Sequence, residues 1–135
     1  MNLSERLPAV LEEILAVTRE DDGALTVHHA DTFASLRVVT IAEDLDLVSL
    51  TQVLAWDLPL DSKIRARVAK HAHDTLLGTV SLVEKIGTGN NGAKKTGDVL
   101  LRYNFPAAGL TDDALRTLVL MVLDTGADVR NALAD

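Results

Sequence analysis

The spacing of hydrophobic side chains divides the chain into segments of helical and of strand period. In the first segment the apolar positions recur three and four residues apart, which predicts an amphipathic helix over residues 5–20. After a polar turn the period changes to two, and strands are predicted over residues 24–28, 32–42 and 45–57. Short polar turns join these strands, so we expect them to form an antiparallel meander.

The second half of the chain returns to helical spacing and then alternates again. A helix is predicted over residues 62–76, a hairpin of two strands over about 80–86 and 99–105, and a last helix over 112–134 with Thr111 as its N-cap. The predicted order is α-β-β-β-α-β-β-α, an α+β fold in which an antiparallel sheet packs against helices. No linker or internal repeat interrupts the chain, so we expect its 135 residues to form a single domain.

The last predicted helix contains a stretch, residues 118–123, that is apolar on every side. A helix of this kind must be covered on more than one face, and in a chain this short a second subunit is the simplest cover. We therefore expect a homodimer. The predicted interface residues are Leu118, Leu120, Met121 and Leu123.

Composition and charge narrow the classes of function. There is no cysteine and aromatic residues make up 3% of the chain, which argues against thiolate metal sites and against a stacking platform for single-stranded nucleic acid. The net charge of −7 argues against affinity for nucleic acid. It is unevenly spread: residues 1–62 carry 3 basic and 12 acidic side chains, and residues 63–102 carry 8 and 3. No stretch reaches the roughly 20 apolar residues of a membrane span, and no signal peptide is recognisable, so we expect a cytoplasmic protein without membrane contact.

The best candidates for contact with another protein are Trp56 and the basic face of the helix over residues 62–76. That face carries Arg65, Arg67 and Lys70, and an aromatic side chain near arginines is the usual composition of a binding hot spot. The alternative for Trp56 is a place in the core, because it ends an apolar strand whose alternation puts it on the face of Val48, Leu50 and Leu54.

A glycine-rich segment, residues 87–97, comes close to a phosphate-binding loop. Gly89, Lys95 and Thr96 have the spacing of such a loop, but Lys94 occupies the position that must be glycine. A phosphate-binding loop also leads into a helix, whereas here a strand is predicted to follow. The segment is therefore predicted to be a hairpin loop, and no nucleotide is expected.

The histidines do not predict a metal site. His28 and His29 are neighbours on a predicted strand and point to opposite faces, and His71 and His73 diverge by about 200° around a predicted helix. No Gly-x-Ser-x-Gly nucleophile elbow is present. We expect no catalytic residues, no metal and no cofactor; a triad dispersed along the chain leaves an enzyme as an open alternative.

Element order and hydrophobic spacing resemble those of one bacterial family. The resemblance rests on two segments. They are the run at residues 57–61 before the second helix and the passage from Asn104 through Phe105 and Pro106 to Thr111. The chain resembles the YbjN-like sensory-transduction regulators, which have the fold of the type III secretion chaperones. The resemblance implies a dimer that binds another polypeptide in a chaperone-like or regulatory role, without enzymatic activity. The rival functions are a small-molecule sensor with a pocket between sheet and helix, and a cryptic enzyme.

Overall fold

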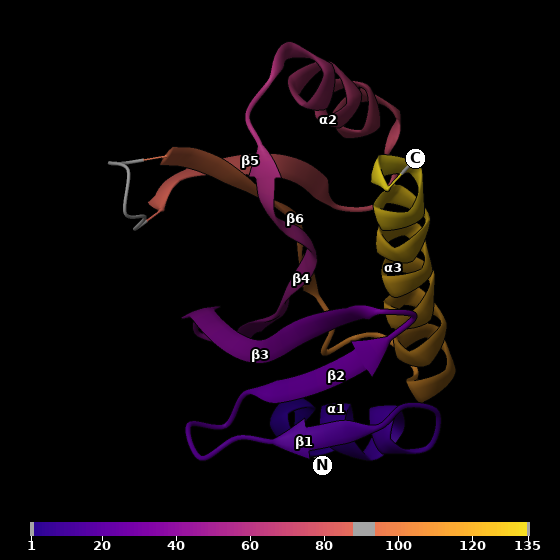
Figure 1. The fold of residues 1–135 in the computed structure, drawn as a ribbon. Coiled ribbons are helices and arrows are strands. Elements are labelled where there is room, and N and C mark those ends of the chain that lie inside the picture. Colours follow the sequence, from indigo (N-terminus) through magenta and orange to yellow (C-terminus); the bar gives the residue numbers. More distant parts are fainter. Residues whose placement is uncertain (1, 88–93, 135) are drawn as a thin grey trace.

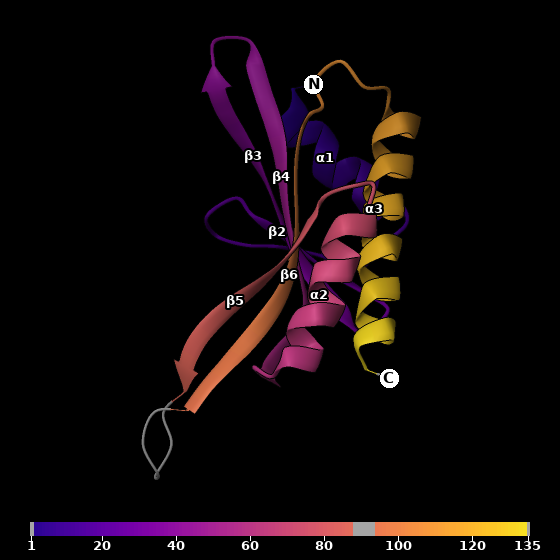
Figure 2. The ribbon, with the colours of Figure 1, turned by 90° about the horizontal axis from the view of Figure 1, so that it is seen from above.

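The computed structural model describes residues 2–87 and 94–134, which form a six-stranded antiparallel sheet with its helices on one face (Figures 1 and 2). Across the sheet the strands run in the order β1-β2-β3-β4-β6-β5. In chain order the elements are α1 (Leu3–Glu12), β1 (Val17–Arg19), β2 (Leu25–His29), β3 (Thr32–Ala42), β4 (Leu45–Pro59), α2 (Ser62–Asp74), β5 (Thr79–Gly87), β6 (Lys94–Pro106) and α3 (Asp112–Leu133).

The predicted α+β fold is confirmed, with one strand added near the start. The helix predicted over residues 5–20 ends at Glu12, and Val17–Arg19 forms the edge strand β1, in which Val17 is opposite Val27 of β2. Periodicity alone missed this strand because Ile14 and Leu15 continue the helical spacing. The β-branched residues at 17 and 18 favour extended backbone, and pairing with β2 provides it.

The glycine-rich hairpin differs from its prediction. Strands β5 and β6 are longer than expected, so residues 94–97 of the predicted loop belong to β6, while residues 88–93 lie outside the described residues. Gly97 is buried, and a Cβ built there would lie 2.6 Å from Leu82 Cδ1 and 2.7 Å from Leu60 Cδ2. The absence of a side chain at Gly97 therefore lets the end of the hairpin pack against Leu60 and Leu82.

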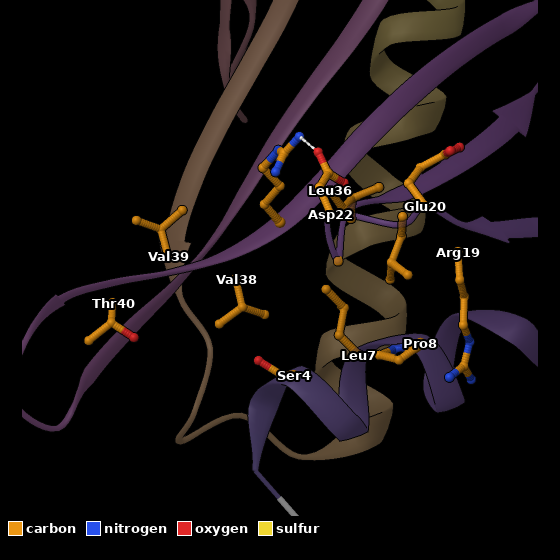
Figure 3. Close-up of a pocket in the computed structure, with 13 residues that line it drawn as sticks. Ser4, Leu7, Pro8, Arg19, Glu20, Asp22, Leu36, Val38, Val39 and Thr40 are labelled. Carbon is orange, nitrogen blue, oxygen red and sulfur yellow. Dashed lines mark hydrogen bonds and ion pairs between the residues drawn. The ribbon is translucent and has the colours of Figure 1, made fainter.

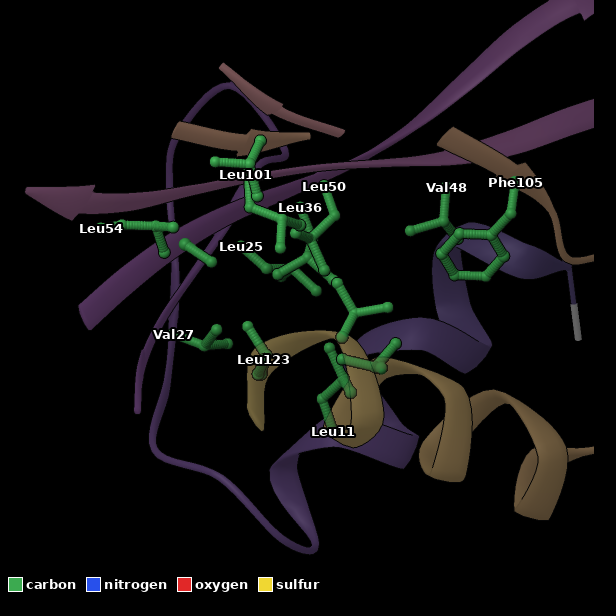
Figure 4. Close-up of a cluster of buried hydrophobic side chains, with 14 of the residues drawn as sticks. Leu11, Leu25, Val27, Leu36, Val48, Leu50, Leu54, Leu101, Phe105 and Leu123 are labelled. Atoms are coloured by element: carbon green, nitrogen blue, oxygen red, sulfur yellow. The ribbon is translucent and has the colours of Figure 1, made fainter. Parts of the chain in front are cut away.

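The core lies between the sheet and the helices (Figure 4). One buried cross-strand row runs through all the strands from β2 to β5. Its members are Val27, Ala34, Gln52, Leu101 and Val80. Helix α3 packs on this row, and Gly126 of α3 lies against the side chain of Gln52.

Helix α3 begins where the sequence predicts. The Thr111 hydroxyl accepts a hydrogen bond from the Ala114 N–H at 3.0 Å, as expected of an N-cap. The buried stripe of α3 includes Leu115, Val119 and Val122, together with Leu123, which is completely buried. The prediction that Leu123 lies in a dimer interface is therefore wrong, because the core of its own protomer already covers it.

Candidate functional site

A cavity of about 710 Å³ lies between α1 and β3 (Figure 3). Its apolar side chains come from both elements and from the start of β2, and polar side chains surround its mouth. The lining is formed by Ser4, Leu7, Pro8, Arg19, Glu20, Asp22, Gly23, Leu25, Leu36, Arg37, Val38, Val39 and Thr40. We call this cavity the α1–β3 groove.

One wall of the α1–β3 groove is a strand edge without a neighbour. Strand β2 pairs with β3 from His29 opposite Thr32 to Leu25 opposite Leu36, and the pairing stops there. Strand β3 continues to Ala42 and pairs with β4 on its other side. Within the described ranges, residues 37–42 therefore have a paired strand on one side and the groove on the other.

The alternation of an antiparallel ladder identifies the backbone groups that face the groove. The turn between β2 and β3 has two residues, Ala30 and Asp31, with φ of 46° and 64°, which is the type I′ geometry. The residues that flank such a turn form a hydrogen-bonded pair, so Thr32 directs its N–H and C=O toward β2. Every second residue of β3 after Thr32 directs its backbone groups to the same side. The N–H and C=O groups of Val38 and Thr40 therefore lie on the free edge.

Ion pairs neutralise the basic groups at the mouth of the groove. Arg37 Nη2 lies 2.6 Å from Asp22 Oδ2, and Arg19 Nε lies 2.7 Å from Glu12 Oε1. The hydrogen bond from Arg37 lowers the pKa of Asp22, and that from Arg19 lowers the pKa of Glu12. Both pairs are exposed to solvent, so they shape the mouth more than they stabilise the fold.

Acidic side chains around the groove are left without a basic partner. The third basic residue of the first 62, Arg6, is also paired, with Asp112 at 3.0 Å. In the part of the chain that the structure describes, no ion pair involves Glu20, Asp21 or Glu43. Of these three residues, Glu20 lines the groove, and among the described residues it is the lining carboxylate that no ion pair neutralises.

Trp56 lies on the face of the sheet that the helices leave open. Its ring centroid is 6.3 Å from that of Phe33, which in turn is 6.3 Å from the ring of His28. The side chains of Trp56 and Phe33 are 53% and 39% exposed, so Trp56 is not a core residue. The pairing of β4 with β6 shifts register between Val53 and Ala55, which turns Trp56 away from the core face predicted by simple alternation.

The basic residues predicted beside Trp56 lie elsewhere. Helix α2 packs on the opposite, helix-covered face of the sheet (Figure 2). Arg65 forms an ion pair with Glu84 of β5 at 2.6 Å, Arg67 is half-buried and Lys70 is exposed. The structure therefore does not bring Trp56 and the α2 arginines into one patch, and a binding role for any of them stays a prediction.

The outer side of α3 offers a small apolar surface. Met121 is 51% exposed, and Leu118 and Leu120 are half-buried. Asp124 and Asp128 are exposed one and two turns further along the helix. The interface predicted on α3 thus keeps three of its four residues and remains untested.

The described side chains that could bind a metal ion are dispersed over the structure. Across residues 2–87 and 94–134, no three His, Cys, Asp or Glu side chains meet in a way that could hold a metal ion. His29 instead contacts Asp124 of α3, with 2.6 Å between Nε2 and Oδ1. Among the described residues, no helix is long and apolar enough to cross a membrane.

Comparison with known proteins supports the fold. No protein-family model matches the chain, and no curated protein matches it. The crystal structure of YbjN from E. coli, a suggested transcription regulator, is similar over 99% of this chain and 95% of that one, with a TM-score of 0.64 and 11% sequence identity. At this identity the likeness shows a shared α+β fold and nothing of function.

Sequence reasoning missed the α1–β3 groove, although the sequence contains a signal for it. The first two predicted strands differ in length, 24–28 against 32–42, and a longer strand beside a shorter one must leave part of its edge unpaired. That α1 lies beside this free edge depends on tertiary packing, which the pattern does not specify.

Proposed function

We propose that the protein is a non-enzymatic regulatory module that binds another polypeptide, and that the α1–β3 groove holds an extended segment of that partner. The observation that carries this proposal is the free edge of β3 inside an apolar groove. Strand addition to such an edge supplies affinity through main-chain hydrogen bonds, while alternate side chains enter the groove. Val38, which is half-buried, is an apolar lining residue that such a side chain would contact.

The surroundings of the groove favour a basic partner. Arg19 and Arg37 are already paired, so an incoming segment meets the carboxylate of Glu20, which lines the groove and has Asp21 next to it in the chain. Complementary charge increases the association rate and the specificity of such a contact. The proposed ligand is an extended segment in which apolar residues alternate with polar ones and lysine or arginine predominates among the charged side chains.

The regulatory role draws support from the structural likeness to YbjN, described as a suggested transcription regulator. We infer that the chain is a distant relative of the YbjN-like proteins with a type III secretion chaperone-like fold. Binding of an extended polypeptide suits both a regulator and a secretion chaperone, and it requires no catalytic group.

The direct test is fluorescence anisotropy with a labelled octapeptide in which valine alternates with lysine and threonine. We expect saturable binding, about tenfold weaker binding when glutamate replaces lysine, and loss of binding when alternate amides are N-methylated. In the protein, Val38→Pro removes an N–H from the free edge, where proline is tolerated, and should abolish binding without lowering the melting temperature. Should Val38→Pro unfold, Ser4→Trp on the α1 wall is the second blocking variant.

The matched control is Trp56→Ser on the opposite face of the sheet, which should bind the peptide like the wild type. Equal binding of the N-methylated peptide, or binding unaffected by both blocking variants, would contradict strand addition. Binding of decanoate that Ser4→Trp blocks, without any peptide binding, would support the small-molecule sensor instead.

A further inference from the structure

On the open face of the sheet, the order of apolar and polar rows is the same in both directions along the strands. Paired residues of β3, β4 and β6 form four successive rows across this face, each on the side opposite to the buried rows. In order they are Phe33–Val53–Leu100, Ser35–Thr51–Arg102, Arg37–Ser49–Asn104 and Val39–Leu47–Pro106. The outer rows are apolar and the inner rows are polar.

The outer rows expose more apolar surface than a solvated sheet face needs. Phe33 and Val39 are each 39% exposed, although both belong to strands in the middle of the sheet. Beyond the rows, exposed Trp56 extends one end of the apolar surface and exposed Ile41 extends the other. Apolar surface at both ends of a helix-free face marks an interaction site.

We propose that this open face binds the same face of a second copy, about a twofold axis that lies between the two inner rows and runs across the strands. An isologous interface of this kind must be self-complementary, and the apolar-polar-polar-apolar order satisfies that condition. The axis places Phe33 opposite Val39 of the second copy, Thr51 opposite Ser49, and Arg102 opposite Asn104. No like charges face each other in these pairs.

This interface shares Arg37 and Val39 with the lining of the α1–β3 groove, whereas Phe33, Thr51 and Arg102 lie outside that lining. It differs from an interface on α3, where Met121 is the exposed apolar residue. Two aligned sheets pack about 10 Å apart with interdigitated side chains, which the exposed Phe33, Val39 and Ile41 permit.

Sedimentation velocity at micromolar concentration tests the proposal, with a dimer expected at twice 14.5 kDa. Phe33→Lys and Val39→Glu each place a charge opposite an apolar residue and should weaken dimerisation about tenfold or more. Mixing the two variants should restore a heterodimer, because one contact becomes Lys opposite Glu and the other remains Val39 opposite Phe33. Both positions are exposed, so neither variant should lower the melting temperature.

Met121→Glu is the control and should leave the dimer intact. A monomeric wild type would overturn the proposal, as would a dimer broken by Met121→Glu and preserved by Phe33→Lys. Loss of dimer in both single variants without recovery on mixing would overturn the end-for-end register. Phe33 does not line the groove, so Phe33→Lys should leave peptide binding unchanged, and the two proposals fail separately.

Discussion

Gly126 of α3 and Gln52 of β4 occupy complementary space in the core: a Cβ at Gly126 would overlap the amide of Gln52. Gln52 is fully buried, and its Nε2 donates to Thr32 Oγ1 at 2.8 Å and to the Leu123 carbonyl at 3.1 Å. The amide of Gln52 therefore links β4 to both β3 and α3.

Gly126→Ala should therefore destabilise the protein by about 1–3 kcal/mol, because overpacking outweighs the gain of about 1 kcal/mol in helix propensity. Urea denaturation measures the change. In a Gln52→Ala background the same substitution should be neutral or stabilising, since the overlapping amide is gone. Equal destabilisation in both backgrounds would show that Gly126 is required for another reason.

At the end of the long hairpin, Gly97→Val should lower the free energy of unfolding by about 1–3 kcal/mol. The new Cβ would meet Leu82 Cδ1 and Leu60 Cδ2, at 2.6 and 2.7 Å. Leu82→Ala should relieve part of the cost, which a double-mutant cycle by urea denaturation would reveal. The substitution also tests the extent of β6, because a residue in a solvated loop would tolerate valine.

Stability should fall slightly in acid through the carboxylates paired with Arg19 and Arg37, by a small amount because both pairs are exposed to solvent. The folded-state pKa values of Glu12 and Asp22 are depressed by Arg19 and Arg37. A depressed carboxyl contributes stability above its unfolded pKa and loses it as the pH falls through its folded pKa. The loss should start as the pH approaches the ordinary values of 4.5 for Glu and 3.8 for Asp and be complete only below them.

Arg37→Gln should flatten this acid dependence, because Asp22 then loses the partner that lowers its pKa. The comparison is the urea midpoint of each variant at neutral and at acid pH. Lys70→Gln, which removes an exposed positive charge on α2, is the matched control and should leave the slope unchanged. An identical slope in Arg37→Gln would mean that other carboxylates cause the acid transition.

Zinc, and ATP with magnesium, should leave the melting temperature unchanged. A ligand that binds the folded state stabilises it by about 2.7 kcal/mol at a hundredfold excess over its dissociation constant, or several degrees for a chain of this size. The described histidines do not converge with acids into a metal site, and strand β6, rather than a helix, begins at Lys94. A reproducible shift with either ligand would contradict the non-enzymatic interpretation and direct attention to Lys95 and Thr96.

The fold was largely predictable because hydrophobic and polar residues alternate over most of its strands. Residues 32–42 were predicted as a strand with the observed bounds of β3, and Thr111 was predicted as the N-cap of α3. Prediction failed where tertiary contacts override the local pattern. Strand β1 exists because β2 pairs with it, and Trp56 faces the open side because of the register shift after Val53.

The candidate site was less predictable than the fold. The alternation of Val48, Leu50 and Leu54 does not show that Gln52, between them, would bind Thr32 and the Leu123 carbonyl. Likewise, the unequal lengths of the first two predicted strands indicated a free edge, but its position beside α1 follows from packing across the whole domain. A site formed by segments far apart in the chain cannot be recognised from the hydrophobic periodicity of any single segment.

Amide hydrogen exchange at Val38 and Thr40 tests the central claim most directly. In the free protein both amides face the groove and should exchange rapidly, while amides of β3 that pair with β4, such as Val39, should be protected. Saturation with the alternating valine-lysine-threonine peptide should slow exchange at Val38 and Thr40 and leave Val39 as it was. Rapid exchange at both positions in the saturated complex would contradict strand addition to β3.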